Sequence, residues 1–343
     1  MPKVFITRPI PEIGTKMLKV KKYDVLVNEK AEGRAATKEE MIHGAKGADA
    51  ILSILTDKID ADVMDAGLAS PKPGDRVSPK ASAVAQGGPT LKIIANYAVG
   101  FDNIDLEAAK KRKILVTNTP GVLTNTVAEH TFALMLSIAH RISEADRFSK
   151  AGKYHAWGPN LLLGTDLSGK TLGVVGLGRI GSRVAYHAVK GFDMKVLYND
   201  PKPNADFEKE FNAQYVEKLD DMLPNCDFVS IHVPLLDSTR HLINESRLRI
   251  MKRSAYLINT SRGPIIDEKA LAVALSKGTI RGAAIDVFEF EPEIVPELKS
   301  LDNVILTPHI ASATEETRNK MAEMAAQNII EALEGRTPPN LVT

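Results

Sequence analysis

The sequence lacks several features that mark secreted, membrane and nucleic acid-binding proteins. Among its 343 residues there is a single cysteine, Cys226, so an intramolecular disulfide is excluded and a reducing compartment is favoured. Cys226 lies just before an apolar segment, two residues ahead of its start at Phe228, and we expect a buried structural thiol there rather than a nucleophile.

Net charge is also nearly absent. The 44 Lys and Arg residues against 43 Asp and Glu residues leave a net charge of +1, which provides no general attraction to nucleic acid or anionic membranes. No apolar run approaches the length of a membrane span, and residues 1–7 are typical of a first strand rather than a signal peptide. We therefore expect a cytoplasmic protein with neither a nucleic acid nor a membrane as partner, and we predict no metal site.

The sequence does contain a regular alternation of strand-like and helix-like segments. Short apolar segments are separated by amphipathic stretches in two series, which is typical of βαβ units and parallel sheets. The segments are residues 4–10, 23–28, 50–55 and 91–97, followed by 172–175, 195–198, 228–233, 256–259, 283–287 and 304–306. Because the chain is long enough for two cores, it predicts an α/β fold with two doubly wound parallel-sheet domains.

Two segments depart from this alternation. Residues 125–147 predict one long helix that is apolar nearly all round, and such a helix needs a second packing partner such as another subunit. Residues 68–89 are rich in Pro, Gly, Ser and Ala without periodicity, and they predict a long surface loop.

The most informative motif is a G-x-G-x-x-G sequence at Gly176, Gly178 and Gly181, between an apolar strand and a helical pattern. Such glycines permit a tight turn, a close approach of the backbone to a pyrophosphate and close packing of the helix. Asp200 ends the next strand, at the spacing of a carboxylate that binds ribose hydroxyls. The motif predicts a Rossmann domain that prefers NAD(H), while Lys202 leaves NADP(H) possible as an alternative.

Polar residues follow three strands of the second series. Arg262, Glu291 and His309 come after the segments 256–259, 283–287 and 304–306, at the sheet edge where open α/β sheets bind ligands. Reduction of a 2-keto acid needs a cation for the carboxylate, an acid that protonates the ketone oxygen, and a carboxylate that keeps this acid charged. These three residue types match those needs.

Together the motifs resemble the D-isomer-specific 2-hydroxyacid dehydrogenases over essentially the whole chain. The matching segments are residues 176–181, 232–234, 259–263, 286–292 and 307–310. The resemblance implies that Arg262 binds the substrate carboxylate and keto oxygen, that His309 is the acid/base, and that Glu291 orients and charges His309. It favours Glu291 over Glu289 because the family's acid directly precedes proline.

The resemblance is strongest to the glyoxylate and hydroxypyruvate reductase branch. It implies a flavodoxin-like substrate domain (residues 1–106 and 311–343), a Rossmann domain (107–310) and substrate contacts by Leu55, Val99 and Gly100. The cofactor contacts it implies are Gly176, Gly178, Arg179, Ile180, Gly181, Asp200, Val233, Pro234, Thr239, Thr260, Ser261, Asp286 and Ser312. Because family members pair through residues 125–147, it also implies a homodimer in which Trp157 reaches the partner's pocket.

The predicted function is therefore reduction of a small 2-keto acid, glyoxylate or hydroxypyruvate, to the D-2-hydroxy acid with NADH. Two alternatives stay open. One is a dehydrogenase for another D-2-hydroxy acid such as D-lactate, since the shape of the pocket is not encoded in a motif. The other, from a different class, is a corepressor-like binding protein of the same fold that senses NAD(H).

Overall fold

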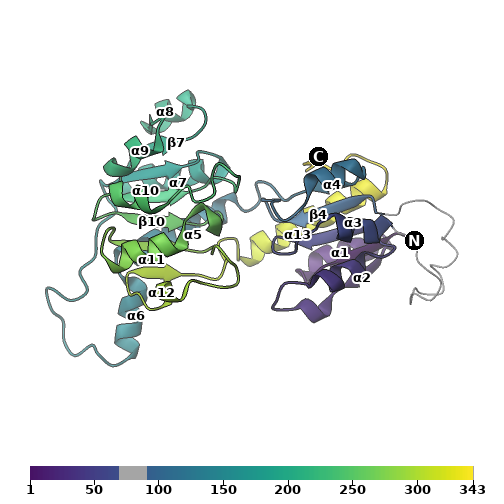
Figure 1. Ribbon diagram of the computed structural model, residues 1–343, viewed down its shortest axis with the longest axis horizontal. Coiled ribbons are helices and arrows are strands. Elements are labelled where there is room, and N and C mark those ends of the chain that lie inside the picture. Colours follow the sequence, from purple (N-terminus) through teal and green to yellow (C-terminus); the bar gives the residue numbers. More distant parts are fainter. Residues whose placement is uncertain (69–90, 343) are drawn as a thin grey trace. The chain divides into compact units, whose positions relative to one another are not determined.

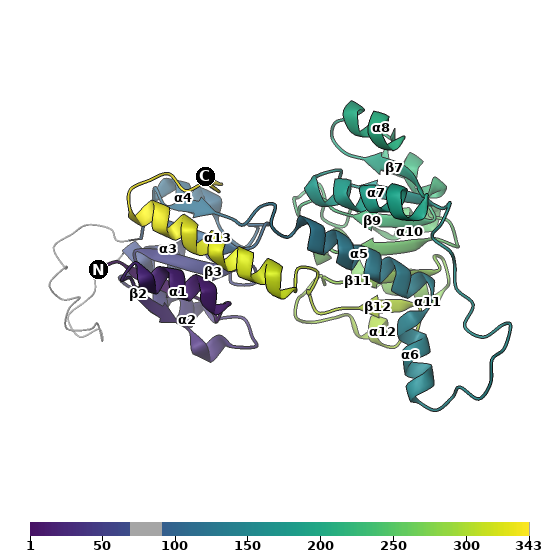
Figure 2. The same ribbon diagram turned by 180° about the vertical axis from the view of Figure 1, so that it is seen from behind.

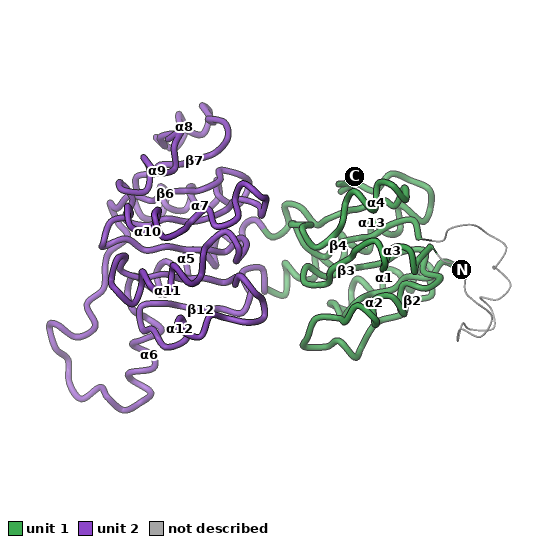
Figure 3. Tube along the Cα trace, in the orientation of Figure 1, with its two compact units in different colours: residues 1–123, 314–343 green, residues 124–313 purple. Residues whose placement is uncertain are grey.

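The computed structural model describes residues 1–68 and 91–342, which form two compact units (Figures 1 and 3). Unit 1 comprises residues 1–123 and 314–343, and unit 2 comprises residues 124–313. Apart from Leu68, the loop predicted over residues 68–89 lies outside the described residues. Among the described helices, none is both long and apolar enough to cross a membrane.

Unit 1 is built on a five-stranded parallel sheet in the flavodoxin-like order β2-β1-β3-β4-β5. Its strands are β1 (Lys3–Ile6), β2 (Asp24–Val27), β3 (Ala50–Ile54), β4 (Ile93–Tyr97) and β5 (Leu115–Thr117). Its helices are α1 (Glu12–Val20), α2 (Lys38–Ala45), α3 (Ala61–Leu68), α4 (Leu106–Lys111) and α13 (Glu315–Leu333). Figure 2 shows α13 alongside α1, where Gly14 permits close packing because an added Cβ would lie 3.0 Å from the Ala322 carbonyl oxygen.

Unit 2 is built on a seven-stranded parallel sheet in the order β12-β11-β10-β9-β6-β7-β8. Its strands are β6 (Thr171–Val175), β7 (Lys195–Asn199), β8 (Gln214–Tyr215), β9 (Phe228–Ile231), β10 (Tyr256–Asn259), β11 (Gly282–Ile285) and β12 (Val304–Leu306). Its helices are α5 (Thr124–Ala139), α6 (Ile142–Lys150), α7 (Arg179–Phe192), α8 (Ala205–Phe211), α9 (Leu219–Met222), α10 (Glu245–Ile250), α11 (Glu268–Ser276) and α12 (Pro296–Lys299).

Helices cover both faces of the unit 2 sheet, as parallel sheets require. Phe132 on α5 and Val184 on α7 are buried in one apolar cluster, while Leu248 on α10 and Leu271 on α11 are buried in another. Cys226 is fully buried in the second of these clusters, and burial raises the pKa of its thiol to about 12. The predicted fold class, two doubly wound α/β domains of which one is a Rossmann domain, is confirmed.

The prediction of one helix over residues 125–147 is wrong. The chain forms α5 and α6 instead, because Arg141 adopts a left-handed backbone conformation (φ 57°) between them. The Ala139 carbonyl, which a continuing helix would bond internally, accepts the Thr165 amide at 2.9 Å. Arg141 is the N-cap residue of α6, which begins at Ile142, and its guanidinium is bonded to Glu144 at 2.6 and 2.7 Å. The apolar surface of α5 is largely buried within unit 2 itself.

The sequence pattern does not predict the short strands β5 and β8. Strand β5 pairs with β4 and is the fifth strand of the unit 1 sheet. The chain therefore stays in unit 1 beyond α4, up to residue 123. The predicted boundary after residue 106 falls inside α4, whereas the compact units change at residue 124. On the C-terminal side the units change at residue 314, close to the predicted boundary at 311.

Candidate functional site

The glycine-rich loop joins β6 to α7. Gly176 has a φ of +92°, and a Cβ there would lie 2.8 Å from a methyl group of Val233. A Cβ at Gly181 would lie 2.0 Å from the Gly176 carbonyl oxygen, so the helix packs directly on the turn. A Cβ at Gly178 would meet nothing within 4 Å. Gly176 and Gly181 are thus required by the fold, whereas Gly178 borders open space at the start of α7.

This arrangement fits a dinucleotide. Helix α7 begins at Arg179 without a side-chain cap, so its first amides and the positive end of its dipole are available to phosphate oxygens. Asp200 directly follows β7, the strand next to β6, and its carboxylate accepts the Leu177 amide at 2.8 Å. The carboxylate is therefore held beside the glycine loop, in the position expected for a ribose partner.

Several polar segments come together at the carboxyl ends of the unit 2 strands. Asn259 of β10 pairs in register with Ile285 of β11, which pairs with Leu306 of β12. The three strands therefore end at one level, and the segments that carry Arg262, Glu291 and His309 leave the same edge of the sheet.

His309 and Glu291 form a pair at this edge. The Nδ1 atom of His309 lies 3.0 and 3.1 Å from the two carboxylate oxygens of Glu291, and both side chains are about three-quarters buried, at 24% and 22% exposure. The amide of Phe288 donates to the same Glu291 carboxylate at 3.1 Å. Glu289 instead contacts Nε2 of His241 at 2.7 Å. The structure thus joins Glu291, and not Glu289, to His309.

The turn that carries His309 is fixed by a buried carboxylate. Asp286 is fully buried and accepts the Thr307 hydroxyl at 2.6 Å and the amides of Ile310 and Ala311 at 2.9 and 2.8 Å. Its backbone carbonyl accepts the His309 amide at 2.8 Å, which holds His309 at a left-handed φ of 54°. Burial raises the pKa of Asp286, but the hydrogen bonds it accepts outweigh this and lower the net pKa. A cofactor contact by Asp286 stays a prediction.

Arg262 lies in a loop that its neighbours shape. The side chain of Asn259 accepts the Ser261 amide at 3.0 Å and donates to the Arg262 carbonyl at 2.9 Å. A Cβ at Gly263 would lie 1.9 Å from the carbonyl carbon of Phe288, so the loop passes directly against the segment that leads to Glu291. The sequence analysis did not assign a role to Asn259 or Gly263, although both belong to the matching segment 259–263.

The other predicted cofactor contacts bond to neighbouring protein groups or lie beside the glycine loop and the His309 turn. Thr260 contacts the Thr131 hydroxyl on α5 at 3.0 Å, and Thr239 bonds to its own loop at Pro234 and Leu236. Val233 lies against Gly176. Ile180 belongs to the first turn of α7, and Ser312 follows the His309 turn.

The predicted substrate contacts Leu55, Val99 and Gly100 belong to unit 1. Asn118 donates to the Val99 carbonyl and Asn96 to the Gly100 carbonyl, each at 2.8 Å, so both peptide groups are held in place after β4. Leu55 follows the end of β3, the neighbouring strand in the sheet. All three therefore follow strand ends at the carboxyl edge of the unit 1 sheet.

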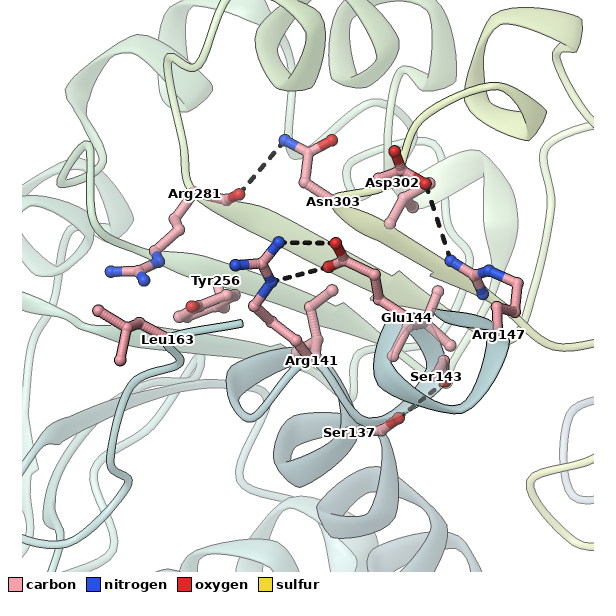
Figure 4. A pocket seen from close by; sticks show the side chains of 13 residues that line it. Ser137, Arg141, Ser143, Glu144, Arg147, Leu163, Tyr256, Arg281, Asp302 and Asn303 are labelled. Atoms are coloured by element: carbon pink, nitrogen blue, oxygen red, sulfur yellow. Dashed lines mark hydrogen bonds and ion pairs between the residues drawn. The ribbon is translucent and has the colours of Figure 1, made fainter. Parts of the chain in front are cut away.

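A cavity of about 200 Å³ opens at the opposite edge of the unit 2 sheet (Figure 4). It is lined by Tyr256 and Val304, which begin β10 and β12, and by Arg141, which pairs with Glu144. None of the predicted site residues lines it. It is therefore separate from the glycine loop and from the His309–Glu291 pair.

The fold and the strand ends of unit 2 together define a dehydrogenase that uses a nicotinamide dinucleotide. The family model of the D-isomer specific 2-hydroxyacid dehydrogenase, NAD binding domain, matches residues 132–311. The chain belongs to this family. The predicted family, enzyme class and NAD(P) cofactor are thereby confirmed.

Similar proteins come from archaea and bacteria. The chain is 49% identical to the glyoxylate reductase of Korarchaeum cryptofilum, over 99% of this chain and 96% of that protein. It is 45% identical to the glyoxylate reductase of Pyrococcus furiosus, over 99% and 95%. Among solved structures, the NADPH-dependent glyoxylate/hydroxypyruvate reductase of Sinorhizobium meliloti, in complex with NADP and malonate, has a TM-score of 0.80 and 29% identity, over 100% and 97%.

Proposed function

We propose that this protein reduces glyoxylate, and also hydroxypyruvate, to the corresponding 2-hydroxy acid with NADH. The observation that carries the proposal is the His309–Glu291 pair, at 3.0 Å, on the same sheet edge as Arg262 and the glycine loop. The names of the relatives in Korarchaeum cryptofilum and Pyrococcus furiosus, both glyoxylate reductases, support this substrate.

Each residue of the site has a defined part in this proposal. Arg262 binds the substrate carboxylate through its planar guanidinium, which matches two carboxylate oxygens. Glu291 contacts Nδ1 of His309, so Nε2 is the ring atom that faces the substrate. The nicotinamide cofactor, when bound, supplies a hydride to the keto carbon. His309 then donates one proton to the keto oxygen, which completes the alcohol.

The cofactor preference follows from Asp200. A carboxylate beside the glycine loop accepts hydrogen bonds from ribose hydroxyls and repels a 2′-phosphate, so we propose a preference for NADH over NADPH. Lys202 supports the alternative, since it is exposed and its ammonium group attracts phosphate, and the Sinorhizobium meliloti relative is described as NADPH-dependent. The ratio of kcat/KM for the two cofactors, measured with glyoxylate, decides between them.

Unit 1 contributes the remaining substrate contacts in this proposal. In this proposal the amides of Val99 and Gly100 bind the substrate carboxylate, and Leu55 contacts the substrate. Steady-state kinetics with glyoxylate, hydroxypyruvate, pyruvate and phenylpyruvate test this assignment. We expect the highest kcat/KM for glyoxylate or hydroxypyruvate. A higher value for pyruvate would instead favour a D-lactate dehydrogenase, and NADH binding without turnover of any of the four would favour the corepressor-like alternative.

The protein is a homodimer in this proposal. The connection from α6 to β6 stands away from the rest of unit 2 (Figures 1 and 2) and carries exposed apolar side chains. Tyr154 is 57%, Trp157 is 79% and Leu163 is 56% exposed, as is typical of side chains that a second subunit covers. Insertion of Trp157 into the partner's pocket and a cytoplasmic location stay predictions. Light scattering at working concentration should give twice the monomer mass, and a monomer would contradict the proposal.

A further inference from the structure

A second group of titratable side chains lies behind the candidate catalytic turn. Glu268, the first residue of α11, is only 1% exposed. Glu289 is also largely buried, at 8% exposure, and it contacts His241 at 2.7 Å. Neither Glu268 nor His241 has a part in the proposed reaction, although both touch the segment that ends at Glu291.

Glu268 and Glu289 are joined by reciprocal hydrogen bonds. The Glu268 carboxylate accepts the Glu289 amide at 2.8 Å, and the Glu289 carboxylate accepts the Glu268 amide at 3.4 Å. The first turn of α11 is therefore attached twice to residue 289. Because Glu289 also binds His241 through its other oxygen, its side chain is held from two directions.

The same segment is confined on its other side by Gly263. An added Cβ at Gly263 would lie 1.9 Å from the Phe288 carbonyl carbon and 2.5 Å from the Glu289 nitrogen, which is direct backbone contact. The peptide between Phe288 and Glu289 is thus fixed between Gly263 and Glu268. The Phe288 amide donates to the Glu291 carboxylate at 3.1 Å, so the position of this backbone determines where the carboxylate meets His309.

Keeping Glu268 buried is unfavourable for stability, which argues that its position matters for another reason. Burial raises the pKa of its carboxyl and, together with the nearby carboxylates of Glu289 and Glu291, outweighs the lowering effect of the backbone amides of Glu289 and Val295. One oxygen of Glu268 is buried and accepts no hydrogen bond of ordinary geometry among the described residues. An apolar residue would avoid this desolvation, but it would leave the Glu289 amide without an acceptor.

We infer that Glu268 is a positioning residue for this reaction: by accepting the Glu289 amide, it holds the turn that presents Glu291 to His309. The inference rests on the proposed function of the His309–Glu291 pair. It predicts that the acceptor oxygen and its reach matter, while the negative charge of Glu268 does not. The charged and titratable groups that face Glu268 are Glu289, Glu291 and, through Glu289, His241.

Three substitutions separate reach from charge. Glu268→Gln keeps an acceptor oxygen at the same distance, Glu268→Asp keeps the charge but shortens the side chain, and Glu268→Ala removes both. We expect kcat/KM for glyoxylate to fall at least tenfold for Glu268→Asp and Glu268→Ala, since small misplacements of catalytic groups are costly. Glu268→Gln should stay within about threefold of wild type, and NADH affinity should be unchanged in all three. Glu297→Gln, at an exposed acid on α12, is the control.

Two further measurements identify positioning rather than general damage. The pH profile of reduction should move to lower pH in Glu268→Asp and Glu268→Ala, because the contact between the Glu291 carboxylate and His309 is weakened. It should stay in place in Glu268→Gln. Nitrogen-edited NMR should show a slowly exchanging Nδ1 proton of His309 in wild type and Glu268→Gln only, with His309→Gln assigning the signal. If Glu268→Ala does not fold, Glu268→Asp carries the test.

The outcomes separate this inference from the proposed function. An unmoved pH profile and a retained Nδ1 proton in Glu268→Asp would overturn the positioning role, even in a fully active enzyme. A loss in Glu268→Gln as large as in Glu268→Asp, or larger, would also overturn it, because the negative charge would then matter at least as much as the reach. A wild type that reduces none of the 2-keto acids would overturn the proposed function, while the NMR signal would still report on the contact between Glu291 and His309.

Discussion

Replacing Gly263 by alanine should disable the site without touching a group that takes part in the chemistry. An ordinary Cβ contact is 3.4 Å or longer, whereas a Cβ at Gly263 would lie 1.9 Å from the Phe288 carbonyl carbon. The difference, 3.4 − 1.9 = 1.5 Å, is the least that the two backbones must move apart. Neither backbone yields as a flexible side chain would, so this displacement reaches Arg262 on one side and Glu291 on the other.

The size of the effect follows from that displacement. A misplacement of about 1 Å at catalytic groups lowers the rate on the order of 100-fold, and overpacking costs about 1–3 kcal/mol of folding free energy. We therefore expect kcat/KM for glyoxylate to fall about 100-fold or more in Gly263→Ala, with a lower melting temperature. The affinity for NADH, measured by its fluorescence on binding, should fall much less than kcat/KM, because the β6–α7 loop is separate from Gly263, although the predicted cofactor contacts Thr260 and Ser261 lie in the loop that moves.

Two other glycines serve as matched controls. Gly191→Ala introduces a Cβ that meets nothing within 4 Å in the last turn of α7, so the variant should be fully active and slightly more stable. Gly178→Ala also meets no protein atom, but its methyl group enters the space proposed for the pyrophosphate, so it should weaken NADH binding without destabilising the fold. Wild-type activity and stability in Gly263→Ala would refute the reasoning from backbone contact.

Three further substitutions test other parts of the site. Arg262→Lys keeps the charge but loses the two-pronged contact with a carboxylate, so kcat/KM for glyoxylate should fall at least 100-fold at nearly constant NADH affinity; unchanged kinetics would remove Arg262 from the site. Asp200→Ser should lower the preference for NADH over NADPH, and a wild type that already prefers NADPH would contradict the role of Asp200. Burial lowers the pKa of His232 from 6.5 to about 3. Below about pH 6.5 the unfolded chain therefore binds a proton at this residue that the folded protein does not bind, so the free energy of unfolding decreases as the pH falls. From pH 7 to pH 5, the decrease in the free energy of urea unfolding should be about 2 kcal/mol smaller in His232→Gln than in wild type. Equal decreases in the two proteins would refute this assignment.

Much of the fold could be predicted because its strands carry strong local patterns. The segments before Gly176 and Arg262 are short and rich in apolar residues, and both form inner strands of the unit 2 sheet. The two strands that escaped prediction, β5 and β8, have three and two residues, although β12, also of three residues, was predicted. Their existence depends on pairing with a neighbouring strand, which is a tertiary property.

The break between α5 and α6 shows the same limit in a helix. Apolar residues continue through Ile142, and no glycine or proline marks the left-handed turn at Arg141. The helix ends because the Ala139 carbonyl is taken by Thr165, which belongs to a segment more than twenty residues away. The local sequence favours continuation of the helix at this point, but a long-range hydrogen bond ends it.

The choice between Glu289 and Glu291 could be made from sequence only through the family pattern of an acid before proline. In an extended segment, residues two apart face the same side, so alternation alone does not separate these two acids. The structure separates them by their partners, since Glu289 contacts His241 and Glu291 contacts His309. Glu268 and Gly263, which come from other parts of the chain, contact the backbone at Phe288 and Glu289, just before Glu291.

Buried acids at the ends of β11 and at the start of α11 therefore have a shared physical task. The turns that carry His309 and Glu291 lack a strand or helix partner for their amides, and buried amides need an acceptor. Asp286 supplies it for Ile310 and Ala311, and Glu268 supplies it for Glu289. A buried acid near the end of a strand or the start of a helix thus fixes the backbone of a turn through the amides it binds, and its residue type alone does not separate this role from a part in catalysis. Only the partners of its oxygens distinguish the two roles.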